Sequence, residues 1–587
     1  MSEGNGNCSL VEVADGLKAK YEQPRAALVP LLFAVQTRDG RVTDEAEQEI
    51  ADLLQIDTEQ VHEAVTFYPL LSEKPLGKIL IQVCHNISCS LLGVEPLIDV
   101  LENELGIKAG EVTPDGEIGL RRSECLGCCC DAPMMLVGEK FFGNLTEEKV
   151  KDVVAKLKAG EEVVNDSPLT PTNEIENPAL SGNFKVPNAS SIKVAEARGA
   201  YQIAKKVLKE MSPEEITNQV KASGLRGQGG AGFPTGLKWS FVPKTDGQKY
   251  LTVNCDESEP GTCKDREILR RDPHKLIEGI IIASKAIGVT KSYIYIRREF
   301  YEPAQILDRA IQEAYDSGYL GKDILGTGMD LDVYTHPGGG AYICGEETGL
   351  IQSLEGRKGW PRIKPPFPAV QGLFWKPTVV NNVETISNVP FIMEKGVEAY
   401  RSRGTEKSPG TKLFGVSGHV KRPGVYELPM GVPLRDLIFG YADGIREGHS
   451  LKAVIPGGSS VPILKAEEID VNMDFESTAE AGTMLGSGGA IVMDETVKIP
   501  EALEVLSRFY AHESCGQCTP CREGGIWIYK ILHRMNSGLG RKGDIELLLD
   551  LAANMDGTTI CPLAAAAAWP VQSAIKKFPE EFEALLY

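Results

Sequence analysis

Four cysteines in the last hundred residues constrain the fold of this chain most strongly. Cys515, Cys518 and Cys521 follow the pattern Cys-x-x-Cys-x-x-Cys, and Cys561 comes forty residues later, directly before Pro562. Three thiolates on one short loop and a remote fourth followed by proline form the spacing typical of a [4Fe–4S] site. Structural zinc is the nearest alternative, although zinc ligands usually come as two separated pairs. A disulfide-linked fold is disfavoured because nothing marks the chain as secreted.

The bulk properties exclude several classes of function. The 587 residues are enough for about three to five domains. The formal charge of −20 argues against a nucleic-acid or anionic-membrane surface. We expect no signal peptide, because residues 1–7 lack a basic segment followed by an apolar one, and no stretch reaches the ~20 apolar residues that span a bilayer. Fourteen cysteines in such a chain indicate metal or redox chemistry.

The chain divides into segments of different composition. Residues 10–70 predict short amphipathic helices, with a capped helix start at Thr43-Asp44. A strand at 78–83, a helix at 91–105, a hairpin at 134–142 and a helix at 146–157 together predict a thioredoxin-like layout. The proline-containing stretch that includes residues 166–173 predicts a linker.

The remainder of the chain predicts three further domains. Residues from about 193 to 395 are glycine-rich and of mixed α/β pattern. Residues 412–439 predict strands, a Pro-Gly turn and a short helix, and 453–464 contain another strand candidate, which suits a small β-grasp domain. From residue 502 to the end the pattern is helical, and we expect the cluster cysteines in loops between helices.

A second group of cysteines lies in the thioredoxin-like segment. Cys84 and Cys89 form one pair and Cys125 and Cys129 another, which matches the four thiolates, two per iron, of a [2Fe–2S] cluster. Cys128, Cys129 and Cys130 are consecutive, so spacing alone does not identify the fourth ligand. Two zinc pairs or buried free thiols are the alternatives.

A long glycine-rich loop is a candidate phosphate site. Residues 227–239 read GQGGAGFPTGLKW, and glycines allow main-chain N–H groups to approach a phosphate closely while Lys238 adds a positive charge. The alternative is a plain turn. Three further segments, 254–261 (NCDESEPG), 338–348 (GGGAYICGEET) and the pair Asn381-Asn382, offer carboxylates or amides for ribose or flavin groups. Taken singly, each of the three is more often a solvated loop or turn.

These motifs together resemble a known family. GQGGAGFPTGLKW, NCDESEPGTCKDR, GGGAYICGEET, PTVVNNVET, ESCGQCTPCREG and Ile560-Cys561-Pro562 occur in the order found in the NADH-binding flavoprotein (51 kDa-type) subunit of respiratory complex I and its soluble relatives, over about 193–585. Residues 10–160 resemble the partner thioredoxin-like [2Fe–2S] (24 kDa-type) subunit, so the chain looks like a fusion of the two.

The resemblance implies a multidomain α/β and α+β fold. It comprises a helical N-terminus with a thioredoxin-like [2Fe–2S] domain at 10–160, a linker at 161–192, a Rossmann-like FMN- and NADH-binding domain at 193–405, a β-grasp domain at 406–500 and a helical [4Fe–4S] domain at 501–587.

The resemblance also implies a site. Lys238 and Glu259 would lie nearest the chemistry, and Cys129 rather than Cys128 or Cys130 would complete the [2Fe–2S] ligands Cys84, Cys89 and Cys125. The [4Fe–4S] ligands would be Cys515, Cys518, Cys521 and Cys561. The residues expected to hold FMN and NADH are Gly227, Gly229, Gly230, Ala231, Gly232, Phe233, Lys238, Phe241, Asn254, Asp256, Glu257, Glu259, Tyr342, Gly345, Glu346, Glu347, Phe367, Asn381 and Asn382.

The implied reaction is hydride transfer from NADH to FMN, followed by single-electron steps through the two clusters. The acidic residues predict a preference for NADH over NADPH, because the 2′-phosphate would add like charge. The implied partner is an iron–sulfur subunit, the large cluster-bearing subunit of complex I, which would hold the chain at the cytoplasmic side of the inner membrane. The alternatives are a diaphorase subunit of a soluble hydrogenase, formate dehydrogenase or bifurcating enzyme, and a non-catalytic sensor. Gln228, where the family usually has arginine, and the three-cysteine run depart from the family pattern.

Overall fold

The computed structural model describes residues 9–167 and 175–587, and it divides into two compact units. Unit 1 contains Met1–Pro75, Glu174–Glu257 and Lys264–Thr411. Unit 2 contains Leu76–Asn173, Ser258–Cys263 and Lys412–Tyr587. Six residues, Ser258–Cys263, therefore belong to unit 2 although the chain on both sides of them belongs to unit 1. The predicted linker lies partly at 168–174, outside the described residues.

Unit 1 begins with the predicted short helices. They are α1 (Leu10–Lys18), α2 (Leu28–Asp39), α3 (Asp44–Leu54) and α4 (Thr58–Phe67). The expected cap is present, since the Thr43 side chain accepts a hydrogen bond from the Ala46 N–H. These helices pack on the rest of unit 1, where the buried Tyr68 hydroxyl donates to Ser353 Oγ at 2.8 Å.

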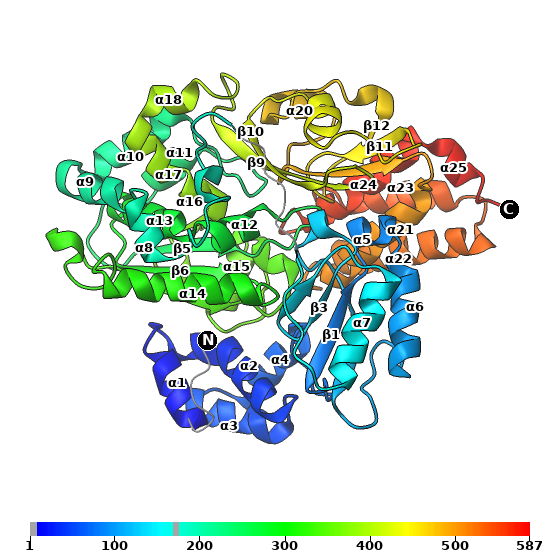
Figure 1. The fold of residues 1–587 in the computed structure, drawn as a ribbon, viewed down its shortest axis with the longest axis horizontal. Coiled ribbons are helices and arrows are strands. Elements are labelled where there is room, and N and C mark those ends of the chain that lie inside the picture. The colour runs from blue at the N-terminus through cyan, green and yellow to red at the C-terminus, as the bar shows by residue number, and fades with distance from the viewer. Residues whose placement is uncertain (1–8, 168–174) are drawn as a thin grey trace. The chain divides into compact units, whose positions relative to one another are not determined.

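A four-stranded parallel sheet forms the centre of unit 1. Its order is β7 (Asp332–Pro337), β6 (Lys291–Ile296), β5 (Tyr250–Cys255) and β8 (Thr378–Asn382). Helices α12 (Lys264–Arg271) and α13 (Pro273–Ile287) connect β5 to β6, and α14 (Tyr301–Asp316) connects β6 to β7 (Figure 1). The chain then returns to the other side of β5 to form β8. This reversal is a topological switch point, and ligands of open α/β sheets bind outside the strand ends there.

Shorter helices complete unit 1 around this sheet. They are α8 (Ile192–Ala197), α9 (Gln202–Glu210), α10 (Pro213–Ser223), α11 (Thr235–Ser240), α15 (Glu347–Leu354), α16 (Val383–Ser387), α17 (Val389–Lys395) and α18 (Val397–Arg401).

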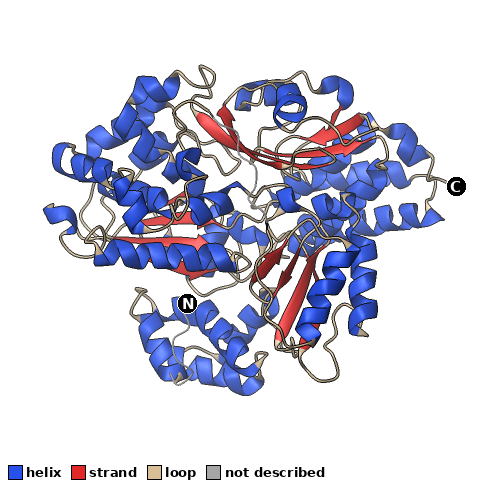
Figure 2. Ribbon diagram, in the orientation of Figure 1, coloured by secondary structure: helices blue, strands red, loops and turns tan. Residues whose placement is uncertain are grey.

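Unit 2 contains the predicted thioredoxin-like module. Its sheet has the order β2 (Ile118–Ser123), β1 (Ile79–Cys84), β3 (Met135–Val137) and β4 (Lys140–Phe142), in which β1 and β2 are parallel and β3 and β4 form the expected hairpin (Figure 2). The single helix expected at 91–105 is two helices, α5 (Ile87–Leu91) and α6 (Val94–Leu105), separated by Gly93 with φ of 79°. Helix α7 (Glu147–Lys158) follows the hairpin.

The β-grasp region of unit 2 has a five-stranded sheet. Its order is β10 (Gly424–Pro429), β9 (Thr411–Gly418), β13 (Gly489–Asp494), β11 (Leu451–Ile455) and β12 (Leu464–Lys465). The strand candidate at 453–464 therefore contains parts of two strands. Short helices α19 (Leu434–Asp436) and α20 (Phe475–Glu480) accompany the sheet, and its core includes Phe414, Leu428, Leu437 and Val492.

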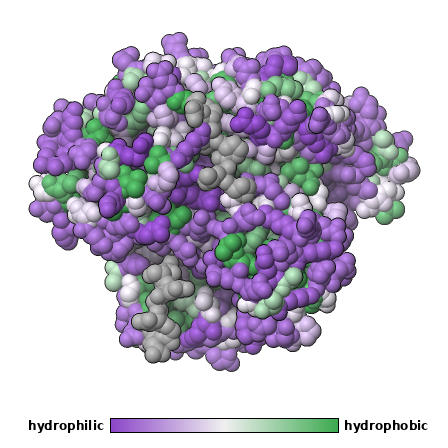
Figure 3. Space-filling model, in the orientation of Figure 1, coloured by the Kyte–Doolittle hydropathy of each residue, from purple (hydrophilic) through white to green (hydrophobic). Residues whose placement is uncertain are grey.

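The last part of unit 2 is a helical bundle, as the sequence predicts. It consists of α21 (Ile499–Glu513), α22 (Thr519–Arg534), α23 (Asp544–Met555), α24 (Leu563–Lys577) and the short α25 (Pro579–Glu583), with α21 packed on both α22 and α24. The face in Figure 3 is mostly hydrophilic, in keeping with the charge of the chain. Within 9–167 and 175–587, no helix has the length and apolarity to cross a bilayer.

Candidate active site and cofactor sites

The predicted flavin-binding residues of unit 1 meet at the switch point of the parallel sheet. Asn254 is near the end of β5 and is paired in register with Asn382 at the end of β8, and Val253 is paired with Asn381. The carboxyl ends of adjacent parallel strands lie at one edge, which is where a sheet of this topology binds its ligand. The sequence placed these residues in separate motifs, and the register brings them together.

The glycine loop lies against this edge. It closes through a hydrogen bond from the Gly227 N–H to the Phe233 oxygen at 2.9 Å, and Gly230 and Gly232 have φ of 137° and 63°. Such φ values favour glycine. A Cβ on Gly229 would lie 3.2 Å from Cβ of Asn382, so glycine at 229 permits the close approach of the loop to β8. Ala231 lies between these glycines in the same loop.

Lys238, on α11, is held between two elements of the site. Its Nζ donates to Glu347 Oε2 and to the Val380 oxygen, each at 2.9 Å. Lys364, which the sequence analysis did not single out, contacts Glu346 Oε1 at 2.9 Å and Glu347 Oε1 at 2.8 Å. Burial opposes ionisation of Glu347, but the two lysines outweigh it and lower its pKa to about 2. The acidic pair is therefore ionised and matched by two cations.

The asparagine amides are fixed by hydrogen bonds. Asn254 Nδ2 donates to the Gly345 oxygen at 2.8 Å, next to Tyr342 in the 3-10 turn Tyr342–Gly345, and its Oδ1 accepts from the Asp256 N–H at 3.0 Å. Trp239 Nε1 donates to Asn381 Oδ1 at 2.9 Å.

Asn382 and Gln228 are held by the start of α16. Asn382 Nδ2 donates to Asp265 Oδ2 at 2.6 Å, and its Oδ1 caps α16. The Gln228 N–H donates to Thr385 Oγ1 at 2.9 Å, and Gln228 itself is buried. Thr385, like Lys364, was missed by the sequence analysis because it lies beyond the quoted asparagine pair.

The three predicted aromatic residues are all exposed. Phe233 and Phe241 have ring centroids 6.3 Å apart, and each exposes about half of its surface. Phe367 is 58% exposed, on the loop before β8. Within the described residues, no ring contact joins Phe367 to the other two. Exposed aromatic rings can stack on a base.

The two glutamates at 257 and 259 belong to different units. Glu257 is buried in unit 1 and accepts hydrogen bonds from the N–H groups of Lys264, Asp265 and Arg266 at the start of α12. Burial, with the nearby Asp265, raises the pKa of Glu257 to about 8. Glu259 belongs to unit 2, where its Oε1 accepts from the Ser460 N–H at 2.8 Å. The structure therefore does not group these side chains with Glu346 and Glu347 as one acidic cluster.

Four buried cysteines of the thioredoxin-like module come together in unit 2. Cys84 ends β1, Cys89 lies in α5, and the sulfurs of Cys125 and Cys129 are 3.4 Å apart. The Cys84 thiol, burial and Cys129 raise the pKa of Cys89 well above its ordinary value, which reflects the proximity of three of these thiols. Four thiols facing one another suit a [2Fe–2S] cluster.

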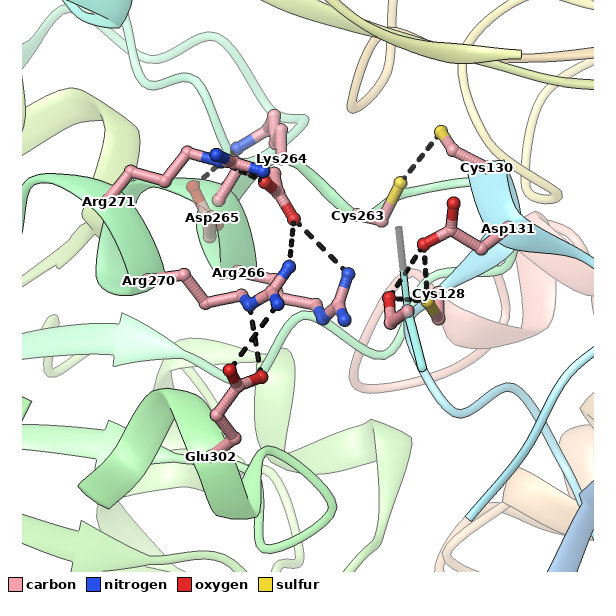
Figure 4. Close-up of polar contacts among 12 residues, drawn as sticks. Cys128, Cys130, Asp131, Cys263, Lys264, Asp265, Arg266, Arg270, Arg271 and Glu302 are labelled. Atoms are coloured by element: carbon pink, nitrogen blue, oxygen red, sulfur yellow. Dashed lines mark hydrogen bonds and ion pairs between the residues drawn. The ribbon is translucent and has the colours of Figure 1, made fainter. Parts of the chain in front are cut away.

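The other two members of the cysteine run have different neighbours. Cys128 Sγ donates to Asp131 Oδ2 at 3.3 Å, and Cys130 Sγ lies 3.0 Å from Cys263 Sγ (Figure 4). These contacts support Cys129 as the fourth ligand. Two residues that the sequence analysis missed, Glu124 and Arg508, link this module to α21, since Arg508 Nη2 donates to the His85 oxygen at 2.7 Å and Arg508 Nε lies 3.4 Å from Glu124 Oε1.

The second cysteine group lies where α21, α22 and α24 begin or end. Cys515 and Cys518 occupy the loop between α21 and α22, and Cys521 is in the first turn of α22. The Ile560 N–H lies 3.5 Å from Cys518 Sγ, which brings the segment of Cys561 to this loop. All four cysteines are free of disulfides, as a [4Fe–4S] site requires.

The chemistry of these donor sets fits the predicted cofactors. The cysteine groups provide four thiols each, and the switch point provides a glycine loop, Lys238 and fixed amides for an anionic flavin phosphate and ring. Thr235 Oγ1, at the start of α11, is buried without a hydrogen-bond partner among the described residues, and a phosphate oxygen would satisfy it.

Comparison with known proteins agrees with this geometry. Residues 220–391 match the Nuo51 FMN-binding domain, 14–158 the thioredoxin-like [2Fe-2S] ferredoxin, 412–492 the SLBB domain and 501–585 the NADH-ubiquinone oxidoreductase-F iron-sulfur binding region. The F subunit of NADH-quinone oxidoreductase in Rickettsia felis is 51% identical over 410 residues, which cover 70% of this chain and 97% of that protein. The chain belongs to the family of NADH-quinone oxidoreductase F subunits. It therefore combines an FMN-binding domain with [2Fe–2S] and [4Fe–4S] regions.

Two further relatives extend this comparison. In Rhizobium meliloti, the NADH-quinone oxidoreductase F subunit that carries the number 2 is 50% identical and covers 69% of this chain and 97% of that protein. A chain of an NAD+-reducing [NiFe]-hydrogenase in the air-oxidized state has a TM-score of 0.84 at 30% identity and covers 97% of this chain and 95% of that chain. The F subunits thus match about 70% of this chain, and the hydrogenase chain matches almost all of it.

Proposed function

We propose that this chain oxidises NADH as the electron-input subunit of an NADH–quinone oxidoreductase of the complex I type. The observation that supports the proposal most is the conjunction of a built flavin site at a switch point with two four-cysteine groups in one chain. When bound, FMN would accept a hydride from NADH and the clusters would accept electrons one at a time. A non-catalytic sensor would have no need of both.

The residues of the chain would act mainly by positioning. Asn254, Asn381 and Asn382 are already fixed by hydrogen bonds, so the flavin ring would meet oriented amides rather than mobile ones. Phe233 and Phe241 offer exposed ring faces to the adenine of NADH. No general base among the predicted residues is required, because a hydride moves directly between stacked rings.

Lys238 would supply the fixed positive charge of the site. Its bonds to Glu347 and to the Val380 oxygen hold the ammonium group at the end of β8, so the charge is in place before the cofactor or substrate arrives. Glu259 is held by the β-grasp region, and its proposed role at the nucleotide stays a prediction.

The test is reduction of ferricyanide by NADH with the purified, cofactor-loaded chain, followed by reduction of quinone with the complex isolated from the host. A chain that holds its cofactors and does not reduce ferricyanide with NADH would contradict the proposed activity. A partner subunit bearing further iron–sulfur clusters, found with the chain by native mass spectrometry, would support attachment to the cytoplasmic side of the inner membrane through that partner.

A diaphorase subunit of an NAD+-linked hydrogenase is the second candidate. It is favoured by one observation, the match of a hydrogenase chain to 97% of this chain, including the thioredoxin-like module that the F-subunit relatives do not cover. The identity of 51% with an F subunit, against 30% with the hydrogenase chain, favours the first candidate. Co-purification with a nickel-containing subunit instead of quinone-linked subunits would decide for the second.

A further inference from the structure

Two cysteines outside both predicted ligand sets face each other in unit 2. Cys130 Sγ and Cys263 Sγ are 3.0 Å apart, although 133 positions separate them in the sequence, and both side chains are buried. Figure 4 shows the two thiols directed toward one another from η2 (Cys129–Asp131) and from the segment Ser258–Cys263. A disulfide needs a sulfur–sulfur distance of about 2.05 Å, so the two atoms would have to approach by about 1 Å.

Both cysteines are held by their surroundings within unit 2. On one side, the Gly261 N–H donates to Cys129 Sγ at 3.3 Å, and the Ser459 N–H donates to the Pro260 oxygen at 3.1 Å. On the other side, the Asp131 N–H donates to the Cys128 oxygen at 3.0 Å, which closes the turn that contains Cys130. The contact between the two thiols is therefore fixed from both ends.

We propose that Cys130 and Cys263 are a redox-modification site, in which hydrogen peroxide converts the two thiols into a reversible disulfide. One thiol sulfur attacks a peroxide oxygen, the O–O bond breaks, and a sulfenic acid and one water form. The sulfur of the second thiol displaces the hydroxyl group of the sulfenic acid, which forms the S–S bond and a second water. The two sulfurs together lose two electrons, the peroxide gains them, and the thiols supply the two protons.

The burial of the pair selects the oxidant and the consequence. A small neutral peroxide can reach a buried thiol more easily than a bulky disulfide such as oxidised glutathione. The new bond would tie η2, which begins with the proposed ligand Cys129, to the segment whose Gly261 N–H contacts that ligand. Hydrogen bonds to ligand sulfurs influence the reduction potential of a cluster, so the bond would act beside a group that tunes it.

The test uses the cluster-loaded full chain exposed anaerobically to graded hydrogen peroxide. After catalase removes the peroxide, free thiols are alkylated in denaturant, and the digest is analysed by mass spectrometry with and without dithiothreitol. The cluster EPR signals are recorded on the same samples. We expect a disulfide-linked peptide pair containing Cys130 and Cys263, removed by dithiothreitol, at peroxide doses that leave the [2Fe–2S] signal intact.

Variants assign the linkage within the cysteine run. Cys263→Ser, Cys263→Ala and Cys130→Ser should each abolish the linked pair, whereas the matched control Cys128→Ser should retain it. Three results would overturn the proposal: no linked pair while the clusters survive, a linked pair that persists in Cys130→Ser, or a linked pair that forms only in proportion to the loss of the [2Fe–2S] signal. The last result would mean that ligands released from a damaged cluster form the bond.

Discussion

The flavin region of unit 1 and the cysteine region of unit 2 are held together in different ways. At the flavin site, Lys238, Lys364, Glu346 and Glu347 satisfy one another, and the asparagine amides already have partners. In the cysteine groups, thiols face thiols, as between Cys125 and Cys129. Thiols are weak hydrogen-bond donors and acceptors, so these groups have little to gain from one another without a metal. The comparison predicts graded effects of mutation in unit 1 and all-or-none effects at the clusters.

Replacing one cluster ligand should give the largest effect. Cys129→Ser should abolish the [2Fe–2S] EPR signal, and Cys521→Ser should abolish the [4Fe–4S] signal, because each cluster needs all four thiolates. Cys128→Ser is the matched control and should leave both signals, since its thiol faces Asp131. A partial loss in the ligand variants, or loss of the [2Fe–2S] signal in Cys128→Ser, would break the comparison.

Replacing Lys238 should reduce activity without abolishing it. Lys238→Met leaves Glu347 with Lys364 as its remaining cation, so we expect kcat/KM for NADH with ferricyanide to fall about 100-fold, or about 2.7 kcal/mol. Lys244→Met, which alters an exposed pair with Glu214 at 3.4 Å, is the control and should change little. Equal rates in both variants would show that the Lys238 contact is structural only.

The nucleotide preference should be smaller than the sequence suggests. The sequence places four glutamates near the nucleotide, but the structure pairs Glu346 and Glu347 with lysines and uses Glu257 to cap α12. We therefore expect NADH to be preferred over NADPH by about tenfold in kcat/KM, equal to ~1.4 kcal/mol. Lys364→Gln removes one compensating charge and should increase this preference. A decrease in that variant would contradict the electrostatic explanation.

The smallest predicted effect concerns pH. The folded pKa of Glu347, about 2, lies below its ordinary value, so its ion pairs stabilise the fold above that ordinary value and are lost as the pH falls toward 2. Glu347→Gln should therefore flatten the fall in unfolding temperature between pH 5 and 3, by the equivalent of about 1 kcal/mol. Glu523→Gln, at an exposed pair with Arg522, is the control. Parallel curves for the wild type and Glu347→Gln would refute the assignment.

Local spacing predicted some parts of these sites and could not predict others. The run of Cys515, Cys518 and Cys521 lies within one loop and the first turn of α22, so its spacing alone identifies it. For the run at 128–130, the direction of each thiol depends on η2 and on residues such as Asp131 and Cys263, which spacing does not describe.

Long-range packing decides the rest of the flavin site. Glu257 and Glu259 are two positions apart but belong to different units, which no local pattern would show. Lys364 follows no motif, and only the return of its loop to α15 brings it to Glu346 and Glu347. The order of the parallel sheet was likewise not predictable from strand propensity, although the fold class and the helical cluster domain were. The predicted domain boundaries and the individual ligand assignments stay predictions.

The six-residue segment Ser258–Cys263 has a consequence for how the chain is made. Unit 2 is not complete until Lys412 and the residues after it have left the ribosome, yet the segment is synthesised within the sequence of unit 1. Its partners Ser459, Ser460 and Ser487 come some two hundred positions later. A nascent or truncated chain ending at Thr411 would hold every residue of unit 1 and would still expose an unsatisfied loop between β5 and α12. The two units therefore cannot be separated by cutting the gene at one position.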